Sequence, residues 1–104
     1  MKKLIASVII PNWNGSKLLE DCLNSLSKQT FKDFEIILVD NGSTDDSLKY
    51  VKNNFPEVRT IALQKNFGFS RAINEGVKIA KAEYVVFLNN DTGVDQDWLK
   101  SLIL

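Results

Sequence analysis

Short apolar runs alternate with amphipathic stretches along the whole chain, and this alternation restricts the fold more than any other feature. The apolar runs predict strands at residues 4–10, 34–39, 58–63 and 84–88. The amphipathic stretches predict helices at residues 16–28, 44–55 and 69–80, followed by a last helix that starts at Asp95 or Asp97. Such regular alternation favours parallel βαβ units with right-handed crossovers. We therefore expect an α/β fold in which a doubly wound, mostly parallel sheet carries helices on both faces.

Composition restricts the size of the fold and its chemistry. With 104 residues, the chain is long enough for one domain with a hydrophobic core and too short for two. The formal net charge of +0 provides no broad basic surface, so nucleic acid is not an expected partner. The chain has no histidine, which excludes Ser-His-Asp and Cys-His catalysis and the usual zinc sites. Its single cysteine, Cys22, is typical of a reducing compartment, so we expect a cytoplasmic protein.

Polar segments follow three of the predicted strands, and ligands of doubly wound sheets bind beyond the carboxyl ends of strands. The first segment contains Pro11, Asn12, Trp13 and Asn14. It is either a turn, with Ser16 as the cap of the next helix, or one wall of a nucleotide pocket. In the second case Trp13 offers an apolar face to a base.

The second polar segment begins with Asp40. Ser43 or Thr44 is expected to cap the following helix, and Asp45 and Asp46 are expected in its first turn, where they favour the helix dipole. These roles leave Asp40 unexplained, because it would lie unpaired at the end of a buried strand. A carboxylate there suits a hydrogen bond from a uracil-type imide N–H or a ribose hydroxyl.

The segment 66–76 opens the third predicted helix. Phe69 begins an apolar stripe that also contains Ala72, Ile73, Gly76, Val77 and Ala80. The helix N-terminus, with Asn66 and Gly68 before it, favours a phosphate, and Arg71 could reach a diphosphate or a base carbonyl. The alternative is a solvated Arg71 and a Gly76 that eases helix packing. The segment is neither G-x-G-x-x-G nor a P-loop, which disfavours a Rossmann dinucleotide site.

The third polar segment is Asn89, Asn90, Asp91 and Thr92. Its composition is that of a common turn, but it follows a central strand. A carboxylate at this position can hold Mg²⁺ or Mn²⁺, which prefer oxygen ligands and often share them with substrate phosphates. Asp91 is therefore the candidate metal ligand.

Four segments together resemble the family 2 glycosyltransferases. They are VIIPNWN (8–14), VDNGSTD (39–45), NFGFSRAINEG (66–76) and FLNNDT (87–92). The resemblance implies a GT-A fold, a nucleotide-diphosphate sugar donor, a divalent metal and inversion at the anomeric carbon. By motif, Pro11 and its neighbours would line the base pocket, Asp40 would bind the base, and Arg71 would meet the base or the diphosphate. Asp91 matches the last acid of the family's D-x-D element.

The chain departs from the family pattern at three positions. Asn89 replaces the first acid of D-x-D, Asn90 is its middle residue, and Asn41 replaces the second acid of the usual Asp-Asp pair. The Asn-Asn-Asp-Thr version is similar to the rhamnosyltransferase-like branch, which implies a UDP- or dTDP-linked sugar. The family's catalytic base lies in an acceptor-binding half, and no residue of this sequence matches it.

The expected function is thus the donor-binding half, residues 1–104, of an inverting glycosyltransferase with a glycan or lipid-linked acceptor. The full-length parent could lie peripherally at the inner membrane face. A non-catalytic nucleotide-binding or interaction module is the alternative, and a sugar-nucleotide pyrophosphorylase is disfavoured because the segment 11–15 has a single glycine. Strand 84–88 is normally covered by a later strand in this fold. Here it is expected to be an open apolar edge that pairs with a second copy.

Overall fold

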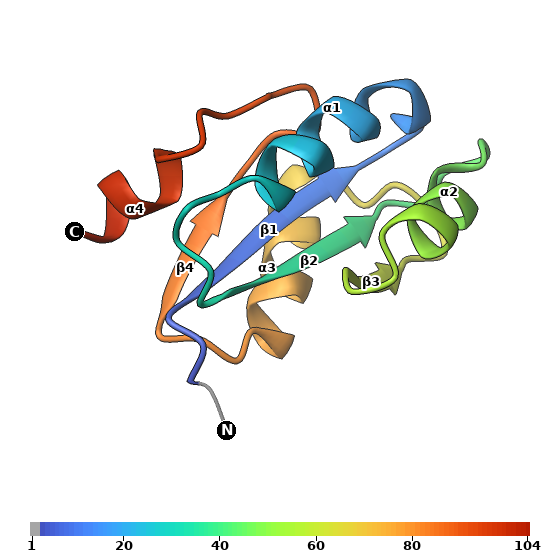
Figure 1. Ribbon diagram of the computed structural model, residues 1–104. Helices are drawn as coiled ribbons and strands as arrows, with labels where there is room; N and C mark the ends of the chain where they lie inside the picture. Colours follow the sequence, from blue (N-terminus) through green and yellow to red (C-terminus); the bar gives the residue numbers. More distant parts are fainter. Residues whose placement is uncertain (1–2) are drawn as a thin grey trace.

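The computed structural model describes residues 3–104, which form alternating strands and helices as the sequence predicts (Figure 1). The strands are β1 (Ala6–Asn12), β2 (Phe34–Asp40), β3 (Arg59–Ala62) and β4 (Tyr84–Phe87). The helices are α1 (Ser16–Ser27), α2 (Ser47–Asn54), α3 (Phe69–Ile79) and α4 (Trp98–Ile103). The strands of this range are parallel to their neighbours, in the order β3-β2-β1-β4, which confirms the doubly wound α/β prediction.

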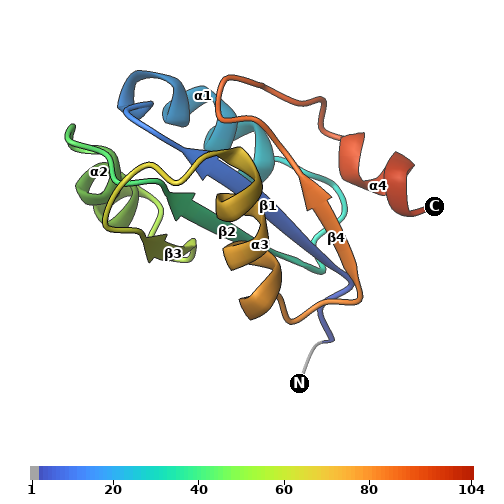
Figure 2. The same cartoon turned by 180° about the vertical axis from the view of Figure 1, so that it is seen from behind.

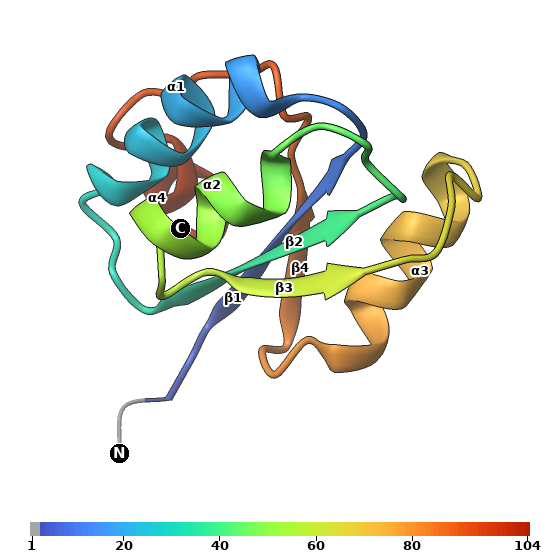
Figure 3. The ribbon, with the colours of Figure 1, turned by 90° about the vertical axis from the view of Figure 1, so that its right-hand side faces the viewer.

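Helices cover both faces of the sheet. Seen from behind, α3 crosses the face of the sheet that is nearer the viewer (Figure 2). The side view places α1, α2 and α4 on one side of the strands and α3 on the other (Figure 3). The chain builds β1, β2 and β3 outward in one direction and then returns to add β4 on the other side of β1. The strand order therefore reverses between β1 and β4, which is where doubly wound sheets bind their ligands.

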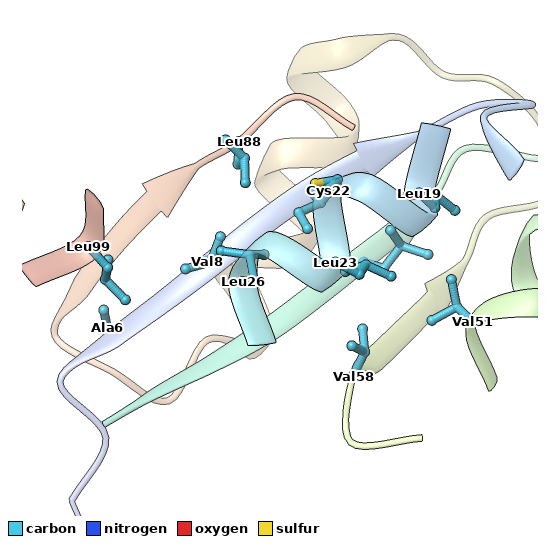
Figure 4. Close-up of a cluster of buried hydrophobic side chains, with 12 residues drawn as sticks. Ala6, Val8, Leu19, Cys22, Leu23, Leu26, Val51, Val58, Leu88 and Leu99 are labelled. Atoms are coloured by element: carbon cyan, nitrogen blue, oxygen red, sulfur yellow. The ribbon is translucent and has the colours of Figure 1, made fainter. Parts of the chain in front are cut away.

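The buried side chains form one cluster on each face. The larger cluster joins Val8 and Ile10 of β1 to α1, with Leu99 of α4 at its far end (Figure 4). The smaller cluster joins Ile9 of β1 and Val39 of β2 to α3. Because β1 is covered on both faces, its successive residues 6–10 are fully buried, and its centre, formed by Val8, Ile9 and Ile10, is a continuous apolar run.

Gly76 allows α3 to lie close against the sheet. A Cβ atom at this position would lie 2.6 Å from Ile9 Cγ2 and 3.2 Å from Val39 Cγ2, both of which belong to fully buried side chains. The packing role that the sequence allowed for Gly76 is confirmed. Phe69 and Val77 differ from the prediction, because they are 57% and 43% exposed and so do not belong to the buried stripe of α3.

The helix starts differ from the sequence predictions. Helix α2 begins at Ser47, so Asp45 and Asp46 precede it, and the prediction that they form its first turn is wrong. Asp45 instead accepts hydrogen bonds from the backbone N–H groups of Ser47 (2.9 Å) and Ser16 (3.1 Å). The predicted caps at Ser43 or Thr44 and at Ser16 are likewise wrong, because Asp46 and Gly15 occupy the N-cap positions. Among the described residues, no helix combines the length and apolar character needed to cross a membrane.

Candidate functional site

A cleft of about 420 Å³ lies over the carboxyl ends of β1 and β4, where the strand order reverses. This volume is within the range of roughly 300–1,000 Å³ that is usual for small-ligand sites. The cleft is bounded by the segments that follow β1, β2 and β4 and by the start of α3. Its lining residues are Pro11, Asn12, Trp13, Asn41, Asn66, Gly68, Phe69, Asn89, Asn90 and Asp91.

The structure brings most of the candidate site residues of the sequence to this cleft. These are Pro11, Asn12, Trp13, Asn66, Gly68, Asn89, Asn90 and Asp91. Asn41 and Phe69 also line it. From the sequence, Asn41 is only a departure from a family pattern, and Phe69 is expected in the core. The sequence signal that could have identified both residues as cleft residues is their position. Asn41 directly follows the end of β2, and Phe69 is the first residue of α3.

Asp40 is the last residue of β2, directly before the lining residue Asn41, and is only 2% exposed. Its carboxylate accepts hydrogen bonds from Asn12 Nδ2 at 3.0 Å, from the backbone N–H of Ser43 at 2.9 Å and from Ser43 Oγ at 2.6 Å. The expectation that Asp40 is unpaired is therefore wrong. One partner, Ser43, lies in the loop that directly follows β2, and the other, Asn12, belongs to the neighbouring strand β1. In this arrangement the carboxylate fixes the loop that follows β2, which we call the β2 loop.

Asn14 connects two loops. It is not among the described residues that line the cleft. Its backbone has a φ of 51°, in the left-handed region that asparagine tolerates better than most residues. Its Oδ1 accepts from the backbone N–H groups of Thr44 (2.8 Å) and Asp45 (3.2 Å), and its own N–H donates to Ser43 Oγ (2.8 Å). Asn14 therefore ties the loop after β1 to the loop after β2.

Asn41 holds the segment that leads into α3. Its Oδ1 accepts from the backbone N–H of Phe67 at 3.0 Å, and its Nδ2 donates to the backbone carbonyl of Gly68 at 3.1 Å. An aspartate at this position could accept but not donate, so the amide does what the family's usual acid could not. Gly68 has a φ of 92°, a conformation that favours glycine.

Arg71 is in the first turn of α3, two residues after Phe69, and is not among the described residues that line the cleft. Its guanidinium is 4.7 Å from the centre of the Phe67 ring, and its Nε is 3.3 Å from Glu75 Oε1. The side chain is 53% exposed, and exposed ion pairs of this kind contribute little free energy. Arg71 can therefore leave Glu75 at small cost when a stronger anion is present.

Asp91 supplies the carboxylate at the β4 end of the cleft. Within residues 3–104, no cluster of three or more histidine, cysteine, aspartate or glutamate side chains could hold a metal ion. The exposed Asp91 fits a hard cation that takes its remaining ligands from phosphate oxygens and water. Burial, and then the charge of Asp91, raise the pKa of the Cys22 thiol to about 11, so Cys22 remains a neutral thiol near the site.

Comparison with known proteins gives consistent results. A family model described as "Glycosyl transferase family 2" matches residues 7–104. "Glycosyltransferase GlyG" of Streptococcus pneumoniae serotype 4 is 36% identical over 107 residues, covering 98% of this chain and 35% of that protein. "Uncharacterized glycosyltransferase YibD" of Escherichia coli K12 is 42% identical over 91 residues, covering 85% and 26%. The chain thus spans about a third or less of the length of these relatives.

The solved structures agree with the sequence relatives. Staphylococcus aureus TarS 1–349 in complex with UDP superposes with a TM-score of 0.89 at 32% identity, over 96% of this chain and 31% of that one. Its complex with UDP-GlcNAc gives a TM-score of 0.88 at 33% identity, over 96% and 30%. The mannosyltransferase PcManGT of Pyrobaculum calidifontis, in complex with GDP-Man and Mn²⁺, gives 0.86 at 24% identity over 97% and 32%, which shows the fold alone.

Proposed function

The chain belongs to glycosyl transferase family 2, and we propose that it is the donor-binding part of an enzyme that transfers a sugar from a nucleotide-diphosphate sugar to an acceptor hydroxyl. The observation that carries the proposal is the cleft at the β1–β4 switch point. It combines an exposed aromatic ring, Trp13, with the start of α3 and the carboxylate of Asp91. These are the groups that a base, a diphosphate and a divalent cation require.

The nucleotide is proposed to lie along the cleft with its base against Trp13 and its diphosphate toward Gly68 and Asp91. Asn66, Gly68 and Phe69 border the space before α3, where backbone N–H groups favour negative charge. Arg71 is proposed to turn from Glu75 toward the diphosphate or the base. Asp40 is proposed to contribute by holding the loop that follows β2. For direct contact with the base, its carboxylate would have to give up a hydrogen bond from Asn12 or Ser43.

Asp91 is proposed to hold Mg²⁺ or Mn²⁺, with Asn89 and Asn90 as neutral neighbours. When bound, such a cation neutralises the charge that develops on the departing diphosphate. The support is the chemistry of the carboxylate and its exposure at the cleft. The Mn²⁺ of PcManGT belongs to that protein, whose likeness to this chain concerns the fold.

A UDP-linked sugar is the favoured donor, because TarS, at 32–33% identity, was solved with UDP and with UDP-GlcNAc. A dTDP-linked sugar and the rhamnosyltransferase-like branch stay predictions. So do inversion, a glycan or lipid-linked acceptor, and a cytoplasmic parent held peripherally at the membrane. We propose that residues 1–104 bind the donor and that the catalytic base lies outside them, so transfer by this chain alone is not expected.

Calorimetric titration of UDP and dTDP into the purified chain, with Mn²⁺ and with EDTA, tests the proposal. We expect binding that Mn²⁺ strengthens, and loss of the Mn²⁺ effect in Asp91→Asn. Asp40→Ala should weaken binding under both conditions, because it loosens the β2 loop. A folded chain that binds neither nucleotide would instead support a non-catalytic interaction module.

A further inference from the structure

The carboxamide of Asn12 joins two sides of the cleft. Its Oδ1 accepts a hydrogen bond from Asn90 Nδ2 at 2.8 Å, and its Nδ2 donates to Asp40 Oδ1 at 3.0 Å. Asn12 is 2% exposed, so water does not compete strongly for these bonds. We propose that Asn12 is a positioning residue that fixes the loop carrying Asp91 relative to Asp40. Its effect on ligand binding rests on the function proposed above.

The chemistry of the groups permits a single orientation of both amides. Asp40 can only accept, so the NH₂ group of Asn12 must face it. The oxygen of Asn12 then faces the β4 loop, where Asn90 must present its own NH₂ group. An aspartate at position 12 could not donate to Asp40, and an aliphatic residue could bond to neither side. Only a carboxamide of this length serves both partners.

Gly15 provides the space for the amide pair. A Cβ atom at Gly15 would overlap both Asn90 Nδ2 and Asn12 Oδ1. The backbone of Gly15 has a φ of −106°, which any residue can adopt, so the requirement for glycine here is spatial. The absence of a side chain at Gly15 thus leaves room for the hydrogen bond between Asn12 and Asn90.

The amide pair holds the β4 border of the cleft, and the backbone of Asn12 holds the opposite border. Asn90 directly precedes Asp91, so a shift of Asn90 moves the candidate metal ligand. The backbone carbonyl of Asn12 also accepts from the N–H of Asn41 at 2.7 Å, which fixes the opposite border. Groups that orient a metal ligand typically change metal affinity by about 10–100-fold when they are removed.

The test measures UDP affinity with Mn²⁺ and with EDTA and takes the ratio as the metal enhancement. Asn12→Ala, Asn90→Ala and Gly15→Ala should each reduce the enhancement by about tenfold. The double variant Asn12→Ala/Asn90→Ala should do no more than either single variant, because both remove the same link. Asn74→Ala, at an exposed position on α3, is the matched control and should leave the enhancement unchanged.

Two results would overturn the proposal. One is a folded Asn12→Ala variant whose metal enhancement is unchanged. The other is a double variant in which the effects of Asn12→Ala and Asn90→Ala on the enhancement multiply. If the unaltered chain binds no nucleotide, the proposed function fails. The link is then tested by urea unfolding of the unaltered chain, Asn12→Ala, Asn90→Ala and their double variant. If the changes in unfolding free energy caused by the two substitutions are non-additive in the double variant, the link between Asn12 and Asn90 is supported. Additive changes would contradict it.

Discussion

The guanidinium of Arg59 donates a 2.8 Å hydrogen bond to the carboxylate of Glu35, joining β3 to β2 at the end of the sheet opposite the cleft. The same carboxylate accepts from Ser7 Oγ of β1 and from the backbone N–H of Lys81, both at 2.7 Å. The Glu35 side chain is 8% exposed. One buried acid thus connects three neighbouring strands and the segment that leads into β4.

Acid should destabilise the chain through Glu35. Burial alone would raise its pKa, but the hydrogen bonds from Lys81, Ser7 and Arg59, with the charge of Arg59, outweigh burial and lower the pKa below its usual 4.5. Because the folded pKa is the lower one, ionised Glu35 stabilises the fold above the unfolded value. This contribution is lost as the pH falls through the folded pKa. Urea unfolding between pH 7 and pH 3 should therefore show a falling midpoint.

Glu35→Gln identifies the group responsible. At pH 7 we expect it to lower the unfolding free energy by about 2 kcal/mol, because hydrogen bonds to a charged acceptor are lost. Its unfolding midpoint should also change less between pH 7 and pH 3. Glu83→Gln, at an exposed position before β4, is the matched control. An equal pH response in Glu35→Gln and the unaltered chain would contradict the assignment.

Gly76→Ala should destabilise the fold even though alanine favours helices. The propensity gain is about 1 kcal/mol, whereas forcing a methyl group into a packed core costs about 1–3 kcal/mol. The methyl group would meet Ile9 and Val39, whose side chains are fully buried, so the packing cost should prevail. Thermal unfolding measures the result. Gly93→Ala, where a Cβ atom would have open space, is the control, and a stabilised Gly76→Ala would show that α3 can move away from the sheet.

The sequence predicted the strands and the switch-point location because both depend on local pattern. A strand covered on both faces needs a continuous apolar run, and Val8, Ile9 and Ile10 are all fully buried. Parallel strands bring their carboxyl ends to one edge, so the segments after β1 and β4 had to meet. Asn12, at the end of β1, and Asp91, after β4, therefore line one cleft.

The pairing of polar side chains could not be predicted in the same way. Asp40 obtains Asn12, 28 residues away, as a donor only because β1 and β2 pair with these two residues in register. Ser43 does not cap α2, because the helix begins only at Ser47. Its hydroxyl instead donates to Asp40 and accepts from the backbone N–H of Asn14, and the contact with Asn14 depends on how two separate loops meet in the fold. The exposure of Phe69 depends on where α3 begins relative to the sheet edge, which periodicity does not reveal.

Trp13 should report nucleotide binding directly. It is 54% exposed at the cleft, whereas Trp98, the second tryptophan, packs against the larger core cluster. Stacking on a base should quench Trp13 fluorescence, and Trp13→Ala should cost about 1–3 kcal/mol of affinity. The titration is best done in Trp98→Phe, which removes the second emitter. Unchanged UDP affinity in Trp13→Ala would mean that the base lies elsewhere in the cleft.

Strand β4 forms one edge of the sheet within residues 3–104. Tyr84 and Phe87 are 54% and 52% exposed, and an apolar edge strand offers its free backbone groups to another chain. We expect the purified chain to dimerise or aggregate as its concentration rises, measured by light scattering. Phe87→Lys should shift it toward monomer, because a charge on an edge strand opposes pairing. Val77→Lys, at an exposed position on α3, adds the same charge away from the edge and should not. A monomer across a wide concentration range would show that the edge does not pair with a second copy.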